Sequence, residues 1–188
     1  MFAAFNFKRL LSDKHIMSFF RQPLAHRNPL LHRHAVGDQE VSSSAIRSLI
    51  RQKKTFQIDF AALESILNEN TKALIVNSPN NPTGALLSVA TLERLCTLLK
   101  ERSASYGHPI YLLSDEPYRE LVYDATAEVP YLTNLYDHTL VCYSFSKSLS
   151  LPGERIGYVL VCNRMAEFSE VYAAVCGAGR ALGFVCAP

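Results

Sequence analysis

Residues 139–158 read TLVCYSFSKSLSLPGERIGY, and this stretch carries the strongest indications of both fold and chemistry. Its first part, residues 139–143, is a short apolar run typical of a buried strand. The run leads into a serine-rich turn with Lys147, and Arg155 follows eight residues later. Burial at a strand end would disfavour the ammonium form of Lys147 and allow its amine to attack a carbonyl, forming an imine. The alternatives are a solvated loop lysine and, for Arg155, a surface ion pair.

A second strand end lies upstream, in residues 110–118, IYLLSDEPY. Its apolar run delivers polar groups at its carboxyl end, which is where ligands bind in open α/β sheets. Asp115 can stay ionised there and pair with a protonated ring nitrogen, while Tyr118 can direct its hydroxyl at the same ligand. Without this context, Asp115 would be interpreted as a helix N-cap, with Pro117 near the first helical position.

A third strand end is found in residues 73–84, ALIVNSPNNPTG. Two prolines and a glycine fix the turn after the apolar run. Asn81 would then be a positioned amide donor, and the peptide bond before Pro82 is a candidate cis bond. The alternative interpretation is an ordinary tight turn.

Together, the segments NSPNNPTG, SDEPY and SFSK, with an arginine eight residues after the lysine, resemble the class I/II aminotransferases, which are fold-type I pyridoxal phosphate enzymes. The resemblance runs from about Thr55 to the end of the chain. It implies part of an α/β large domain with three layers, α/β/α, and a mostly parallel sheet whose last strand is antiparallel.

The resemblance also implies a role for each matching residue. Lys147 would hold the aldehyde of pyridoxal 5′-phosphate as an imine and then move a proton between the substrate α-carbon and the cofactor. Asp115 would keep the pyridine nitrogen protonated, which makes the ring an electron sink. Asn81 and Tyr118 would hydrogen-bond the phenolic oxygen.

Two further residues are implied at the cofactor phosphate. Arg155 would grip it, since a planar, permanently charged guanidinium suits a dianion, and Ser144 would add a hydroxyl. The implied reaction transfers an amino group from an amino acid to a 2-oxo acid, in a homodimer if the chain were full length. C–S lyases and decarboxylases of the same fold use the same lysine, aspartate and arginine, and nothing in these residues separates them.

The length of 188 residues is short for this family. Three features of the family have no counterpart in this sequence. They are the early glycine-containing helix start that cradles the phosphate, the aromatic residue that stacks on the cofactor, and the C-terminal arginine that binds a substrate carboxylate. We therefore expect a truncated form, and its sequence does not indicate the substrate specificity. The alternative is a catalytically inactive fragment that acts only as a binding or structural module.

Charge predicts a boundary near residue 55. Residues 1–55 contain ten Lys and Arg against three Asp and Glu, whereas residues 56–188 contain nine against fourteen. Residues 1–54 show no long apolar period and no family resemblance, so we interpret them as a basic N-terminal segment of unknown structure. Foreign sequence, an organellar transit peptide and a solvated basic tail are the interpretations considered. Residues 55–188 would be the partial pyridoxal phosphate domain.

Alternating elements are expected after residue 55. Asp59 and Ser88 can cap two helices, and Gly107 follows the second; the predicted strands are residues 73–77, 110–114, 139–143 and 156–162. The cysteines form no Cys-x-x-Cys pair, which favours reduced thiols in a cytoplasmic protein. We predict no metal site, because the histidines lack the spacing of a zinc site. We predict no nucleic-acid partner, because the basic segment lacks a recognisable nucleic-acid-binding fold. We predict no membrane partner, because no apolar run approaches membrane-spanning length.

Overall fold

A computed structural model describes residues 56–181, with side chains through residue 179; the predicted basic segment and residues 182–188 lie outside the described part. Helices and strands alternate, as the sequence predicts. The elements are α4 (Phe60–Ile66), β1 (Ala73–Asn77), α5 (Val89–Tyr106), β2 (Tyr111–Asp115), the 3₁₀ helix η2 (Leu132–Asn134), β3 (Thr139–Ser144), α6 (Phe145–Ser148), β4 (Gly157–Val161) and α7 (Phe168–Ala181).

The helices α4 and α5 begin at the two predicted caps. The Asp59 side chain accepts a hydrogen bond from the amide of Ala62, and the Ser88 side chain accepts one from the amide of Thr91. Each bond satisfies an amide that has no partner inside the helix. Helix α5 ends at Gly107, whose φ of 69° lies in the left-handed region that glycine adopts without strain.

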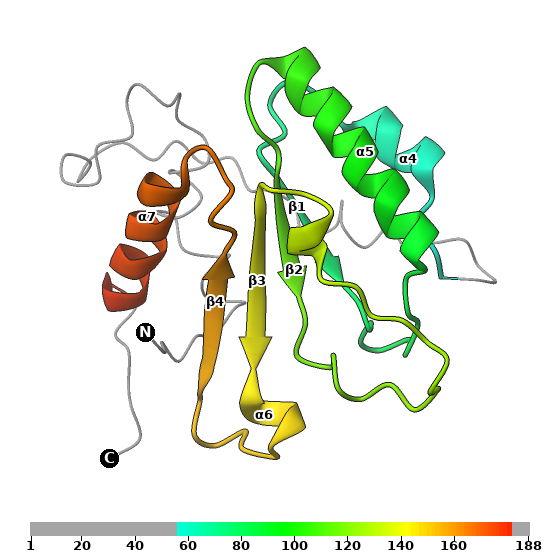
Figure 1. The fold of residues 1–188 in the computed structure, drawn as a ribbon, viewed down its shortest axis with the longest axis vertical. Helices are drawn as coiled ribbons and strands as arrows, with labels where there is room; N and C mark the ends of the chain where they lie inside the picture. The colour runs from blue at the N-terminus through cyan, green and yellow to red at the C-terminus, as the bar shows by residue number, and fades with distance from the viewer. Residues whose placement is uncertain (1–55, 182–188) are drawn as a thin grey trace.

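The four strands form one sheet in the order β1-β2-β3-β4. Strands β1, β2 and β3 are parallel and β4 is antiparallel to β3 (Figure 1), which confirms the predicted mostly parallel sheet. The predicted bounds of β1 are correct, and β2 begins one residue later than predicted. Ile110 stays outside the ladder because its amide donates to Ser103 Oγ at 2.9 Å.

Alternate residues of the strands point to opposite faces, and each face packs against different helices. One face contributes Leu74, Val76 and Leu112 to a core with α4 and α5. The other contributes Tyr111 and Leu113 to a second core that includes Val171 of α7. Figure 1 shows α4 and α5 together on one side of the sheet and α7 beside β4 on the other. This arrangement confirms the predicted three-layer α/β/α fold.

Strands β1 and β4 form the two edges of the described sheet. The exposed residue Leu160 lies on β4. Within residues 56–181, no further strand pairs with the outer edge of β1 or of β4. Among the described helices, none combines the length and the apolar composition needed to cross a membrane.

Candidate functional site at the carboxyl edge of the sheet

The predicted site residues are delivered to one edge of the sheet by the strand register. Asn77 at the end of β1 is paired with Asp115 at the end of β2, and Asp115 is paired with Cys142 of β3. Because β4 is antiparallel, its first residue, Gly157, lies opposite Ser144 at the end of β3. The polar residues that follow β1, β2 and β3 therefore meet at the same edge, together with the residues that precede β4.

Asn81 and Tyr118 are brought into direct contact. Asn81 Nδ2 donates to Tyr118 Oη at 2.7 Å, which joins the turn after β1 to the turn after β2. The peptide bond between Asn81 and Pro82 is cis, as the sequence suggested, and the bond between Ser78 and Pro79 is also cis. The segment after Asp115 is a turn and not a helix, so Asp115 is not an N-cap.

Lys147 lies beside this pair but is more exposed than expected. Its Nζ is 5.7 Å from the centre of the Tyr118 ring. The side chain is exposed, which corrects the expectation of a lysine shielded by burial. The physical reason is that β3 ends at Ser144, and Lys147 lies three residues further on in the short helix α6, beyond the layer of the sheet.

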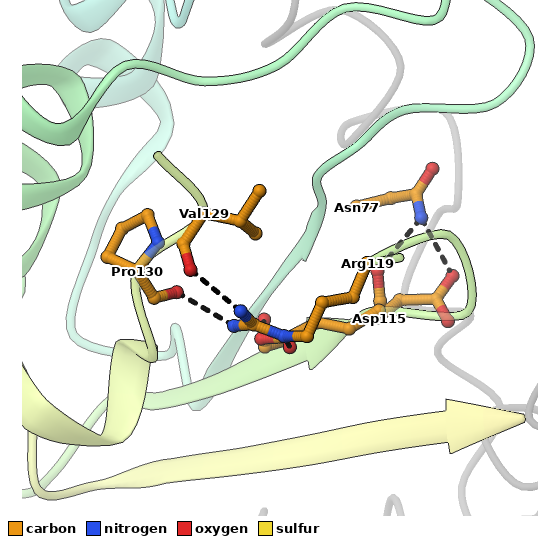
Figure 2. A network of polar contacts seen from close by, with 7 residues as sticks. Asn77, Asp115, Arg119, Val129 and Pro130 are labelled. Carbon is orange, nitrogen blue, oxygen red and sulfur yellow. Dashed lines mark hydrogen bonds and ion pairs between the residues drawn. The ribbon is translucent and has the colours of Figure 1, made fainter. Parts of the chain in front are cut away.

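Asp115 is held by an asparagine to which the sequence analysis gave no role. Asn77 Nδ2 donates to the backbone oxygen of Asp115 at 2.9 Å and approaches its Oδ2 at 3.3 Å (Figure 2). Asn77 Oδ1 accepts the backbone amide of Asn81 at 2.9 Å. Asp115, Asn81, Tyr118 and Lys147 thus form one connected group.

Ser144 and Arg155 occupy the β3–β4 part of the edge. Ser144 Oγ accepts the amide of Ser146 at 3.2 Å and donates to Ser146 Oγ at 2.8 Å. Arg155 has a φ of 54° and is exposed, and its Nη1 donates to the Pro152 carbonyl at 3.1 Å. The amide of Phe145 donates to the carbonyl of Ile156 at 3.1 Å, so the residues that follow Ser144 and Arg155 are bonded to each other.

A buried ion pair supports the loop that carries Tyr118. Arg119 Nε contacts Glu116 Oε2 at 2.7 Å, with 13% of the arginine and 3% of the glutamate side chain exposed. The other guanidinium nitrogens donate to the carbonyls of Val129 and Pro130 at 2.7 and 2.9 Å (Figure 2). Glu116 Oε1 also accepts the hydroxyl of Ser114 at 2.6 Å. This cluster joins the two ends of the loop between β2 and η2.

The electrostatic environment behind the site is acidic. Cys142 is buried next to the end of β2, and burial raises the pKa of its thiol well above the usual value, with further contributions from the negative charges of Asp115 and Glu116. Burial also raises the pKa of Tyr143 and Tyr158, whose rings stack with their centres 5.0 Å apart. The buried Cys142 and Tyr143 and the half-buried Tyr158 therefore lie within electrostatic reach of acidic residues on the β3–β4 side.

Three residues of this arrangement were missed by the sequence analysis: Asn77, Glu116 and Arg119. Asn77 could have been found, because it is the polar residue that ends an apolar run. The three-residue spacing of Glu116 and Arg119 is also visible in the sequence, but a pair at this spacing is usually solvent-exposed. Its burial depends on the contacts of Arg119 with the carbonyls of Val129 and Pro130, which the sequence does not reveal.

Comparison with known protein families agrees with the motifs at this edge. The family model described as aminotransferase class I and II matches residues 40–180, about three quarters of the chain. The chain belongs to this aminotransferase family. The match includes residues 40–55, which lie outside the described part; the foreign origin of residues 1–54 stays a prediction.

Individual aminotransferases are also similar to this chain in sequence and structure. The aspartate aminotransferase of Pyrococcus horikoshii is 31% identical over 133 residues, which are 70% of this chain and 32% of that protein. The aromatic-amino-acid aminotransferase 2 of Thermococcus litoralis is 32% identical over 131 residues, 66% of this chain and 32% of that protein. A crystal structure of an amino transferase from Eubacterium rectale has a TM-score of 0.71 and 57% identity, covering 74% of this chain and 35% of that one. The aminotransferase chain described here thus spans about a third of the length of these relatives.

No metal centre is evident in the part of this aminotransferase that the structure describes. Across residues 56–181, no three His, Cys, Asp or Glu side chains gather closely enough to hold a metal ion.

Proposed function

We propose that this chain carries the cofactor-holding part of a pyridoxal phosphate-dependent aminotransferase, and that Lys147 is the residue that bonds the cofactor. The observation that carries the proposal is the connected group of Lys147, Tyr118, Asn81 and Asp115 at the carboxyl edge of the sheet. This edge is where ligands bind in open α/β sheets.

The donor set fits the chemistry of pyridoxal 5′-phosphate. The cofactor has an aldehyde, a basic ring nitrogen, a phenolic oxygen and a phosphate dianion. The edge offers an amine for the aldehyde, a carboxylate for the protonated nitrogen, amide and hydroxyl donors for the phenolic oxygen, and a guanidinium with a hydroxyl for the phosphate. The residues are Lys147, Asp115, Asn81, Tyr118, Arg155 and Ser144.

When bound, the cofactor supplies an electron sink for negative charge at the substrate α-carbon. Once the substrate's amino group had displaced it from the cofactor, the free Lys147 amine would take the proton from the substrate α-carbon as a general base and, protonated, would serve as the general acid. The Asp115 carboxylate keeps the ring nitrogen protonated. Asn81 and Tyr118 would donate hydrogen bonds to the phenolic oxygen, and Arg155 with Ser144 would anchor the phosphate.

The proposed reaction is the transfer of an amino group from an amino acid to a 2-oxo acid. We leave the amino acid unassigned, because one similar protein is named for aspartate and another for aromatic amino acids. We also propose that a full-length form would be a homodimer, as the resemblance to the class I/II aminotransferases implies.

The experiment is a single-turnover assay. The purified chain is loaded with pyridoxal 5′-phosphate, unbound cofactor is removed, and L-aspartate, L-tyrosine or L-cysteine is added in parallel samples. We expect formation of the corresponding 2-oxo acid, up to one equivalent, with no product from the Lys147→Ala variant. Release of carbon dioxide or sulfide would identify a decarboxylase or a C–S lyase and overturn the transfer reaction. Absence of any product from a chain that retains the cofactor on Lys147 would leave only a cofactor-binding module.

A further inference from the structure

A single side-chain amide connects the two strand ends of the site. Asn77 Nδ2 donates to the backbone oxygen and to Oδ2 of Asp115, and Asn77 Oδ1 accepts the backbone amide of Asn81. Asn80 Nδ2 reaches the same Oδ1 at 3.2 Å. Nδ2 and Oδ1 of Asn77 thus have two partners each, which is as many as an asparagine amide can take.

The partners also fix which way this amide faces. In the reverse orientation, Oδ1 would face two oxygens of Asp115, and Nδ2 would face the backbone N–H of Asn81. Both contacts would be repulsive, so only the observed orientation satisfies the network. The contact to Oδ2 involves a carboxylate, and hydrogen bonds to charged groups are stronger than those between neutral groups.

We propose that Asn77 is a positioning residue of the cofactor site. Its Nδ2 fixes the orientation of the Asp115 carboxylate, and its Oδ1 fixes the backbone of Asn81 so that the Asn81 side chain reaches Tyr118. This inference rests on the proposed function, because it concerns the groups that would hold the ring nitrogen and the phenolic oxygen. Asn77 itself contacts neither substrate nor cofactor in this account.

Neighbouring residues allow a matched comparison. Asn77→Ala removes both halves of the bridge. Asn77→Asp has nearly the same size and keeps the acceptor for Asn81 and Asn80, but it loses the donors to Asp115 and places a second carboxylate beside the first. Asn80→Ala serves as the comparison within the same turn: the Asn80 side chain donates to Asn77 and accepts from Thr83 Oγ1 at 2.8 Å, and no hydrogen bond joins it to Asp115 in the network described.

The test uses the full chain with pyridoxal 5′-phosphate and three measurements: borohydride labelling of Lys147, the dissociation constant of the cofactor, and the pH midpoint of the absorbance change of the bound cofactor. Both Asn77 variants should keep Lys147 as the labelled residue at saturating cofactor and weaken its binding on the order of tenfold, which corresponds to one hydrogen bond to a charged group. In Asn77→Ala, the pH midpoint should move upward, because Asn81 and Tyr118 no longer hold the phenolic oxygen. Asn80→Ala should change both quantities less than either Asn77 variant does, because it removes a contact to Asn77 Oδ1 but leaves the donors to Asp115 in place.

The outcomes separate this inference from the proposed function. If the unmodified chain is not labelled at Lys147, the proposed function fails, and the inference fails with it. If the unmodified chain is labelled but the Asn77 variants match Asn80→Ala in affinity and pH midpoint, the inference alone is overturned. If Asn77→Ala does not fold, the affinity of Asn77→Asp decides: that variant keeps the turn contacts, replaces the donors to Asp115 with a second carboxylate, and must bind the cofactor more weakly than Asn80→Ala does.

Discussion

The buried pair of Glu116 and Arg119 gives a sharp prediction about the stability of the site loop. Arg119→Ala removes the cation from a carboxylate that is 3% exposed, and it also removes the donors to the carbonyls of Val129 and Pro130. Breaking a buried ion pair by removing one partner costs about 3–5 kcal/mol, since an uncompensated charge is left behind. A domain is typically stable by only about 5–15 kcal/mol. We therefore expect Arg119→Ala to remove a large fraction of the free energy of unfolding.

The assay is urea unfolding followed by circular dichroism, with Arg102→Ala as the matched control. Arg102 contacts Glu64 at 3.4 Å, but the two side chains are 38% and 43% exposed. Such a surface pair contributes about 0–1 kcal/mol. The two arginine variants should therefore differ by about 2 kcal/mol or more, with the larger loss at Arg119.

A second pair of variants tests the physical reason for the loss. If the penalty comes from the unpaired buried charge, Glu116→Gln in the Arg119→Met background should restore part of the lost stability, because a neutral amide replaces the stranded carboxylate. The reasoning is refuted if Arg119→Ala is no more destabilising than Arg102→Ala, or if Glu116→Gln makes the Arg119→Met variant still less stable.

Three other predictions concern the frame of the site. Gly157→Ala would place a Cβ 2.2 Å from the Tyr143 carbonyl, so β4 must move away from β3, and we expect the free energy of unfolding in urea to fall by about 1–3 kcal/mol. Gly153→Ala is the control and should be nearly neutral, because its Cβ meets no atom within 4 Å. Equal effects of the two substitutions would contradict this prediction. Ser88→Ala removes the cap of α5 and should cost about 1 kcal/mol in thermal unfolding, while Ser88→Asp should retain most of the stability. Burial raises the pKa of Cys96 from 9.0 to about 11, so between these pH values the unfolded thiol ionises before the folded one and the free energy of unfolding falls as pH rises. Cys96→Ala should make that fall shallower in unfolding curves collected from pH 8 to 11, and an unchanged slope would count against the burial argument.

The sequence predicted the fold well where local chemistry sets the boundaries. Strand β1 has the predicted bounds because an apolar run lies between a polar stretch and a proline-rich turn, and α5 begins and ends at Ser88 and Gly107 as expected. Strand β2 was displaced by one residue because Ile110 bonds to the side chain of Ser103, a partner that no local pattern reveals.

The candidate site was predicted less completely. Asn81 and Tyr118 are in contact, and their role at the phenolic oxygen stays a prediction. The central bridge from Asn77 to Asp115 depends on the register between β1 and β2, which no local pattern gives. The sequence also suggested burial of Lys147, which is exposed because α6 carries it beyond the end of β3. Burial at a strand end is a tertiary property, and the apolar run before Lys147 describes the strand and not the residues after it.

The most direct test of the account is borohydride reduction of the chain in the presence of pyridoxal 5′-phosphate, followed by peptide mass mapping. The chain contains seven lysines, so the other six serve as internal controls. We expect one equivalent of label on Lys147, and we expect Lys147→Arg to abolish it without transfer of the label to another lysine. Label scattered over several lysines, or no label at all, would contradict the claim that this edge of the sheet holds the cofactor.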